Sequence, residues 1–263
     1  MKPIIPVSVC ITTFNEELKL PLCLKNLDFV DEIIIVDSGS TDKTVFIAEQ
    51  YTSKIYQRDF DNYINQKNYC LSKAKNNWVL ALDADEVVSL ELKQELLLIL
   101  QSQLVYDGYF IPRLSFYLNR WIKHGGWYPN YQIRFFNKEK GHFSGLLVHE
   151  TVQITGEITY LKNPLLHYSY NNISEHVKTI NRYSDLTAME KHKLGKKSSI
   201  LFAILEGMWK FFSMFFLRFG FLDGKAGLVI AIMGSYYNFL KYIKLYELNK
   251  KSDSKEYEIY ANK

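Results

Sequence analysis

Acidic residues follow an uninterrupted apolar run in the segment from Trp78 to Glu86, which reads Trp-Val-Leu-Ala-Leu-Asp-Ala-Asp-Glu. The apolar run predicts a strand that is buried on both faces inside a parallel sheet. Residues two apart in an extended chain point to the same side, so Asp83 and Asp85, separated by the small Ala84, are predicted to aim their carboxylates at one point. A divalent cation such as Mg²⁺, itself holding a phosphate, would remove their mutual repulsion. The alternative is a solvated acidic turn that caps the next helix.

Polar residues also follow two other predicted strands. Residues 4–12 read as a first strand that leads into Thr12-Thr13-Phe14-Asn15-Glu16, and residues 32–37 read as a second strand that ends in Asp37. The carboxyl ends of parallel strands share one edge, so these groups are predicted to lie beside the acidic run. A carboxylate such as Asp37 can accept from a base N–H or a ribose hydroxyl, and backbone amides of the 12–15 turn can meet base or phosphate. The sequence lacks the Gly-rich dinucleotide fingerprint and the Walker A motif, which argues against NAD and ATP enzymes of those types.

The elements that must position these residues alternate between strand and helix. A short strand is predicted at residues 54–57, and helices are predicted at 41–51, 62–76 and 89–101. This alternation predicts an α/β fold with a mainly parallel, right-handed βαβ sheet.

A loop between residues 119 and 136 concentrates aromatic, glycine and basic residues, including His124, Trp127, Tyr131 and Arg134. Glycines let the backbone approach a ligand, aromatic rings stack on sugars, and Arg134 can hold an anion through two hydrogen bonds. We interpret the loop as an acceptor or donor-sugar site; an ordinary aromatic loop over the core is the alternative.

Four motifs in the first ninety residues resemble those of the inverting glycosyltransferases of family 2, which have the GT-A fold. They are Thr-Thr-Phe-Asn-Glu-Glu (12–17), Val-Asp-Ser-Gly-Ser-Thr-Asp (36–42), Gln-Lys-Asn (66–68) and Leu-Asp-Ala-Asp-Glu (82–86). The resemblance implies that a nucleotide, usually uridine, and its sugar are bound by these motifs. The residues so implied are Thr12, Thr13, Asn15, Glu16, Asp37, Gly39, Asp83 and Ala84. It further implies that Asp83 and Asp85 bind the donor diphosphate through Mg²⁺ or Mn²⁺.

The same resemblance suggests a catalytic base and a donor contact. An inverting transferase needs a base that takes the proton of the acceptor hydroxyl, and Glu150 stands where the family commonly carries one. A surface strand residue is the alternative for Glu150. The neighbouring His149 is a candidate partner of the base, a metal ligand or a core histidine. Lys67 stands where the family often has Arg, and is either a donor contact or an exposed helix lysine.

Further segments resemble one branch of the family, the lipopolysaccharide inner-core β-1,4-glucosyltransferases of the WaaE/LgtF type. They are His-Gly-Gly-Trp-Tyr-Pro (124–129), Arg-Phe-Phe (134–136), Val-His-Glu (148–150) and Phe-Leu-Asp-Gly-Lys-Ala-Gly (221–227). This resemblance implies transfer of glucose from UDP-glucose to a heptose of the lipopolysaccharide core. Another sugar or acceptor, or a non-catalytic scaffold at the membrane, are the alternatives. His167, beside Tyr168, is a weaker site candidate.

The composition adds limits on partners and compartment. A net charge of +4 is too mild to imply nucleic acid, and Cys10, Cys23 and Cys70 fall in apolar segments that predict buried, reduced thiols.

We expect a catalytic domain over 1–170, with a nucleotide-binding half at 1–90 and an acceptor half at 105–170. A helical region is expected over 171–263. Its two apolar segments, 200–217 and 227–246, with flanking lysines suit the cytoplasmic face of a bacterial inner membrane, or packing on the catalytic domain or another subunit. The oligomeric state is left open.

Overall fold

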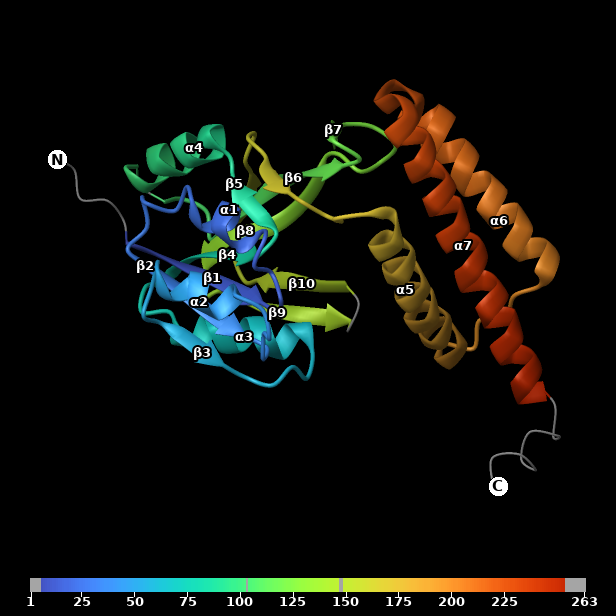
Figure 1. Ribbon diagram of the computed structural model, residues 1–263, viewed down its shortest axis with the longest axis horizontal. Helices are drawn as coiled ribbons and strands as arrows, with labels where there is room; N and C mark the ends of the chain where they lie inside the picture. The colour runs from blue at the N-terminus through green and yellow to red at the C-terminus, as the bar shows by residue number, and fades with distance from the viewer. Residues whose placement is uncertain (1–5, 103, 147–148, 254–263) are drawn as a thin grey trace, which may run out of the picture. The chain divides into compact units, whose positions relative to one another are not determined.

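The computed structural model describes residues 6–102, 104–146 and 149–253 (Figure 1). Contacts between residues divide the chain into two compact units. The first, here called the sheet unit, comprises Met1–Phe116 and Pro129–Ser169. The second, here called the helical unit, comprises Tyr117–Tyr128 and Tyr170–Lys263. Residues 119–128 of the predicted aromatic loop therefore group with the helices.

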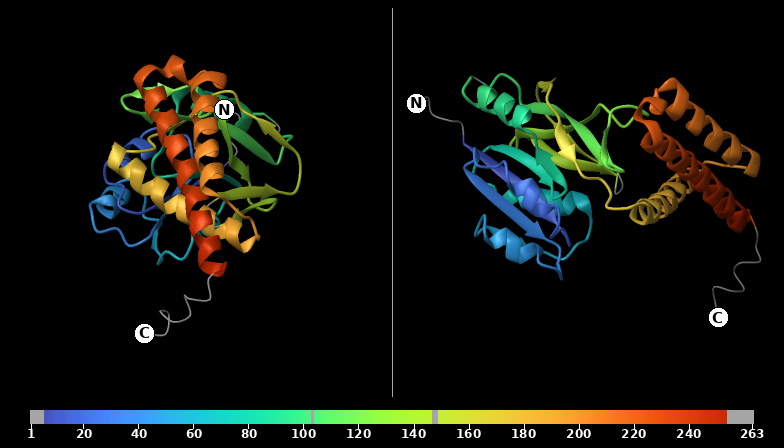
Figure 2. Two further views of the ribbon diagram at one scale, coloured as in Figure 1. Left: turned by 90° about the vertical axis from the view of Figure 1, so that its right-hand side faces the viewer. Right: turned by 45° about the horizontal axis from the view of Figure 1, so that its top comes forward.

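The sheet unit is a twisted sheet with helices on both faces (Figures 1 and 2). Its strands are β1 (Val7–Thr13), β2 (Glu32–Asp37), β3 (Ile55–Gln57), β4 (Trp78–Asp83), β5 (Glu86–Val88), β6 (Gly108–Tyr117), β8 (Asn130–Asn137), β9 (Gly141–Leu146), β10 (His149–Ile154), β11 (Ile158–Tyr160) and β12 (Leu165–His167). Its helices are α1 (Leu20–Leu24), α2 (Thr44–Glu49), α3 (Tyr63–Lys73) and α4 (Leu90–Leu100).

The strands β3, β2, β1 and β4 lie in that order and run parallel, which places their carboxyl ends at one edge. Beyond β4 the sheet becomes mixed, because β8 runs antiparallel to both β4 and β6. Strand β12 is parallel to β6 and antiparallel to β5, and β9 and β10 form a separate hairpin. The predicted α/β class with a mainly parallel sheet, flanking helices and a helical C-terminal extension is confirmed.

Apolar side chains fill both faces of the parallel strands. On β1, Val9 and Ile11 join the core layer that contains α1 and α4, whereas Cys10 joins the layer under α3. Successive side chains of β1 thus enter opposite core layers, and both must be apolar because both faces of this central strand are covered. All three cysteines are free and buried, as predicted.

The helix starts follow local capping. Asn62 accepts from the backbone N–H of Asn65 at the start of α3, and Ser89 accepts from that of Leu92 at the start of α4. Both residues satisfy an amide that the helix itself leaves without a partner. Helix α3 ends at Lys73, three residues before the predicted end, because Ala74 adopts an extended backbone.

The helical unit consists of α5 (Ile173–Lys193), α6 (Ile200–Phe212) and α7 (Gly224–Asp253), with the short strand β7 (Arg120–Ile122). A π-helical turn, Ser213–Leu217, extends α6, and a 3₁₀ turn, Gly220–Asp223, leads into α7. Helices α6 and α7 lie side by side, and α5 packs against α7 (Figures 1 and 2). Helix α7 extends well beyond the predicted apolar segment 227–246 and ends at Asp253.

Candidate active site

The polar ends of β1, β2 and β4 meet at one edge of the sheet, as the sequence predicted. Thr13 pairs in register with Asp37, and Thr12 pairs with Asp83. Three segments that lie far apart in the sequence thus deliver their side chains to the same edge.

Asp37 anchors the turn that follows β2. Its Oδ2 accepts from the backbone N–H groups of Gly39 and Ser40 at 2.9 and 2.8 Å, and its Oδ1 accepts from the Ser40 hydroxyl at 2.5 Å. Gly39 has φ +86°, a conformation that glycine adopts without strain. Asp37 is fully buried, so in this structure its carboxylate holds its own loop in shape.

The loop after β1 is tied to that same turn. The side-chain oxygen of Asn15, a residue with φ 53°, accepts from the Thr41 N–H at 2.8 Å, and the Glu16 N–H donates to the Thr44 hydroxyl at 2.8 Å. The buried hydroxyl of Thr13 has no hydrogen-bond partner among the described residues. A buried polar group without a partner is rare in a folded protein, so this hydroxyl marks a place where a ligand can supply one.

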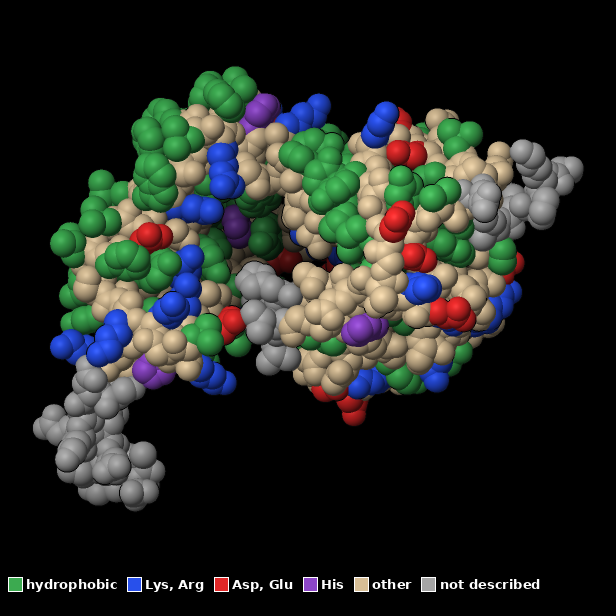
Figure 3. Space-filling model, turned by 180° about the vertical axis from the view of Figure 1, so that it is seen from behind, with side chains coloured by type: hydrophobic (Ala, Val, Ile, Leu, Met, Phe, Trp, Pro, Cys, Tyr) green, Lys and Arg blue, Asp and Glu red, His purple; other side chains and the backbone are tan. Residues whose placement is uncertain are grey.

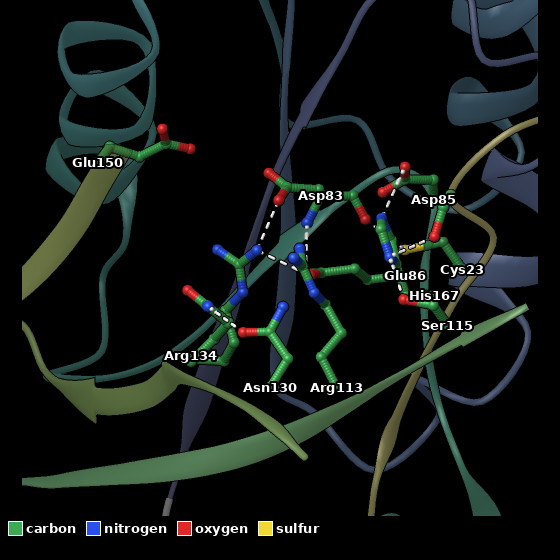
Figure 4. A network of polar contacts seen from close by, with 12 residues as sticks. Cys23, Asp83, Asp85, Glu86, Arg113, Ser115, Asn130, Arg134, Glu150 and His167 are labelled. Carbon is green, nitrogen blue, oxygen red and sulfur yellow. Dashed lines mark hydrogen bonds and ion pairs between the residues drawn. The ribbon is translucent and has the colours of Figure 1, made fainter. Parts of the chain in front are cut away.

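The expectation that Asp83 and Asp85 aim at one point is wrong, because β4 ends at Asp83 and Ala84 and Asp85 form a turn. The two carboxylates have different partners (Figure 4). Asp83 Oδ1 lies 2.8 Å from the Lys67 ammonium, and Asp83 Oδ2 accepts from Arg134 at 2.6 Å. Burial by itself would raise the pKa of Asp83, but the charges of Arg134 and Lys67 hold it well below its ordinary value.

Asp85 faces His167, at the end of β12 (Figure 4). Its Oδ2 lies 3.3 Å from His167 Nε2. The other ring nitrogen, Nδ1, lies 2.9 Å from the Ser169 hydroxyl and 3.3 Å from that of Ser115. Burial would raise the pKa of Asp85, but His167 outweighs burial and lowers it.

The Asp85–His167 pair fits two neighbouring ligands of a divalent cation. Adjacent corners of an octahedron with ligand distances of about 2.1 Å are about 3.0 Å apart, close to the observed separation. The hydroxyls at Nδ1 supply the outer hydrogen bonds that orient a ligating imidazole. The described residues hold no group of three or more His, Cys, Asp or Glu side chains that could bind a metal. A cation here would therefore take its remaining ligands from substrate oxygens and water, as Mg²⁺ commonly does.

Lys67 connects the edge of the sheet to Glu150. Its ammonium lies 3.0 Å from Glu150 Oε1 while also contacting Asp83, and the Lys67 residue is only 6% exposed. The interpretation of Lys67 as an exposed helix lysine is therefore wrong. Glu150 lies in β10 with its carboxylate partly exposed, beside this bridge.

Arg134 lies inside the acidic cluster. Its Nη2 donates to Asp83 and, at 2.7 Å, to Glu86 Oε1, while Arg113 lies 3.4 Å from the same Glu86 oxygen. Glu86 is fully buried, and its Oε2 accepts from the Asp83 N–H at 3.0 Å. The anions that Arg134 binds in this structure are therefore the protein's own carboxylates. The charges of Asp83 and Glu86 raise the pKa of Arg134, although burial by itself would lower it.

The predicted sugar-binding residues are distributed over both units. Tyr131, in the sheet unit, packs edge-on against Tyr160, whereas His124 and Trp127 belong to the helical unit. His124 Nδ1 lies 3.2 Å from Asp223 Oδ1, and the Trp127 ring lies 5.6 Å from that of Tyr117. The predicted loop therefore contributes residues to both units. The side chain of His149 lies outside the described residues.

Sequence reasoning gave no role to Glu86, Arg113 and Ser115, and it treated His167 as a weak candidate. A signal for His167 was available, because it ends a short apolar segment, Leu165–His167. That this segment pairs with β5, which begins directly after Asp85, follows only from the tertiary structure.

Residues 8–153 match the family model described as glycosyl transferase family 2. An uncharacterized glycosyltransferase of Rickettsia conorii is 34% identical, and the alignment covers 94% of this chain and 92% of the relative. The lipopolysaccharide core biosynthesis glycosyltransferase LpsC of Rhizobium meliloti is 26% identical, with 94% of each chain covered. The solved structure of S. aureus TarS 1–349 in complex with UDP-GlcNAc has 16% sequence identity, covers 92% of this chain and 89% of that chain, and has a TM-score of 0.47.

Proposed function

The chain belongs to glycosyl transferase family 2 and has its GT-A fold, and from this premise we propose that it is a metal-dependent, inverting transferase of a sugar from a UDP donor. One observation carries the proposal. A single sheet edge gathers the Asp85–His167 pair, the Lys67 bridge and Glu150, so a cation, a leaving group and a base can act on one substrate.

The nucleotide occupies the loops after β1 and β2 in this proposal. Thr13 offers its buried hydroxyl as the polar contact, and Asp37 holds the turn at Gly39 and Ser40 in shape. Asn15 and Glu16 fix the facing loop, and Thr12 lies beside Asp83 in the sheet. Asp37 then acts mainly by shaping the pocket, because both of its carboxylate oxygens already accept hydrogen bonds.

Asp85 and His167 would hold Mg²⁺ or Mn²⁺, which would supply positive charge to the departing diphosphate. Asp83 takes a different part from the one that the sequence suggested. Since its carboxylate pairs with Lys67 and Arg134, it keeps two cationic side chains beside the diphosphate position.

Glu150 acts as the general base. Its carboxylate takes the proton of the acceptor hydroxyl while that oxygen forms a bond to C1 of the donor sugar. The C1–O bond to UDP breaks on the opposite face of the sugar, so the configuration at C1 inverts. Lys67 contacts both Glu150 and Asp83 and thereby fixes the base relative to the donor side of the site.

Glucose from UDP-glucose is our proposed donor sugar, and a heptose of the lipopolysaccharide inner core is the proposed acceptor. The motifs that resemble the WaaE/LgtF branch support both choices, and the likeness to LpsC, named for lipopolysaccharide core biosynthesis, supports the acceptor. We place the reaction on the cytoplasmic side of a bacterial inner membrane.

The test is UDP release from a panel of UDP-sugars, with Mn²⁺ and truncated core lipopolysaccharide. We expect release with UDP-glucose that depends on the acceptor, stops with a chelator and resumes with added Mn²⁺. Release with a different sugar would change the donor but keep the transferase. If no UDP-sugar releases UDP, and UDP with Mn²⁺ gives no heat of binding, the chain is a non-catalytic scaffold instead.

A further inference from the structure

Helix α6 and the π-helical turn after it turn an apolar face outward in the helical unit. Ile200–Leu217 is long and apolar enough to cross a membrane, and only 17% of this segment is buried. Leu201 is 66% exposed and Met208 is 64% exposed. Ile200, Phe202, Ile204, Trp209 and Leu217 are exposed as well. Leu201, Leu205, Met208, Phe212 and Phe216 recur every three or four residues. This spacing forms one continuous stripe along the helix, here called the outer stripe.

The opposite side of α6 carries the polar groups. Ala203 and Gly207 are buried there, and the close approach lets the Ser235 hydroxyl of α7 donate to the Gly207 carbonyl at 2.8 Å. Glu206 accepts from the amide of Asn238 on α7, both at its carbonyl and at its carboxylate.

Glu206 and Lys210 are the two charged residues between 200 and 217, and both are partly buried. A helix at a water-exposed surface has the reverse arrangement, with its apolar side against the protein. An exposed apolar stripe of this length indicates a surface that is covered by something else.

Basic residues stand at both ends of the outer stripe. Between residues 191 and 246 the sequence contains nine Lys and Arg but only two acidic residues, Glu206 and Asp223. Asp223 is 2% exposed and is held by His124 and by backbone amides of the 120–124 loop. Lys196 and Lys197 precede α6, and Arg218 follows it, all exposed. The hydrophobic and basic side chains are visible together on the helical unit, at the left of Figure 3.

We propose that the outer stripe, together with the exposed Phe219, Phe221 and Leu222, lies in the surface of a bilayer that contains anionic phospholipid. The apolar side chains enter the boundary between headgroups and acyl chains, and the surrounding cations contact anionic headgroups. Trp209, which is exposed on this face, suits the same boundary.

Two features favour a bilayer surface over other occupants. A second copy docked on the same face would bring the basic borders of the two copies together, which opposes association. An anionic bilayer is complementary to that charge. The helix lies in the plane of the membrane, because its inner side is already occupied by α7 and carries Glu206 and Lys210 near the middle of the segment.

The experiment measures binding of the full chain to vesicles without any sugar nucleotide, so its outcome is independent of the proposed transferase activity. The vesicles contain phosphatidylcholine alone or with added phosphatidylglycerol. We expect binding that requires phosphatidylglycerol and weakens with salt. Leu201→Glu with Leu205→Glu lowers the partition coefficient by about tenfold or more. The matched control changes two exposed leucines of α4, Leu90→Glu with Leu98→Glu, and leaves binding unchanged.

Two further measurements keep the result decisive if the outer-stripe variant does not fold. Lys196→Gln with Lys197→Gln reduces binding to the anionic vesicles by about fivefold per lysine. In the wild-type chain, bromolipids quench tryptophan fluorescence, and Trp209→Phe removes most of the quenching. The proposal is overturned if folded Leu201→Glu/Leu205→Glu binds anionic vesicles as the wild type does. It is also overturned if the wild type ignores vesicles and forms a dimer that this variant dissociates.

Discussion

His167 is the residue whose replacement tests the proposed metal site most directly. We expect His167→Ala to weaken Mn²⁺ binding in the presence of UDP, because in the proposed site the imidazole beside Asp85 is one of the two protein ligands. Loss of an outer hydrogen-bond partner of a metal ligand costs about 10- to 100-fold in affinity. Loss of the ligand itself should cost at least the upper value, about a hundredfold or about 2.7 kcal/mol.

The hydrogen bonds at His167 Nδ1 predict a graded second effect. Ser169→Ala removes the 2.9 Å partner but leaves Ser115 at 3.3 Å, so we expect a loss of about tenfold. A serine that contributed only to folding would change thermal stability without this graded loss of affinity.

Calorimetric titration of Mn²⁺ into the UDP-bound protein measures both effects. His142→Ala, an exposed histidine of β9, is the matched control and should bind Mn²⁺ as the wild type does. Thermal melting confirms that each variant is folded. Wild-type Mn²⁺ affinity in folded His167→Ala would refute the assignment of this pair as the metal ligands, even if transfer were impaired.

Three other predictions follow from the same contacts. Glu150→Gln should retain UDP–Mn²⁺ binding by calorimetry but lose transfer by about 10²–10⁴-fold in a UDP-release assay; wild-type turnover would remove Glu150 as the base. Arg134→Met should lower the free energy of unfolding in urea by about 3 kcal/mol, the low end for a broken buried pair, because Lys67 and Arg113 remain. Adding Glu86→Gln should recover part of that loss, and a further loss would contradict the pairing. Burial lowers the pKa of His176 to about 4, below the value of about 6.5 in an unfolded chain, so the unfolded state binds more protons between these values. Stability of the helical unit should therefore fall as pH drops from 7 toward 4. His176→Gln should reduce the accompanying fall in Tm. If Tm depends on pH in this variant as it does in the wild type, the imidazole of His176 is not buried in its neutral form.

The segments around residues 124 and 223 lie about a hundred positions apart in the chain, and the structure brings them into contact. The sequence predicted an acceptor or donor-sugar site at His124, and residues 221–227 entered only as part of the resemblance to one branch of the family. The structure joins them, because Asp223 accepts from the Lys123 and His124 backbone amides at 3.1 and 2.7 Å. Gly126 has φ +80°, and the Arg218 side chain packs where a Cβ would lie. These residues build the helical unit around the loop.

The parallel half of the sheet and the placement of its polar edge were predictable from sequence. An apolar run that ends in an aspartate, as at Glu32–Asp37 and Trp78–Asp83, predicts a buried strand and also the strand end at which polar side chains gather. Local capping by Asn62 and Ser89 likewise fixed where helices begin. These features depend on neighbours in the chain, so composition and spacing are sufficient.

The partners of the acidic residues were decided by the tertiary structure alone. A turn at Ala84 and Asp85 separates two carboxylates that an extended chain would have kept together, and the sequence does not specify that turn. His167 reaches Asp85 because β12 pairs with β5, and Lys67 reaches Glu150 across 83 positions of the chain. A buried charge is tolerated only where a partner group compensates for its lost hydration. Here the partners come from distant parts of the chain, so they are in place only once the whole sheet has formed.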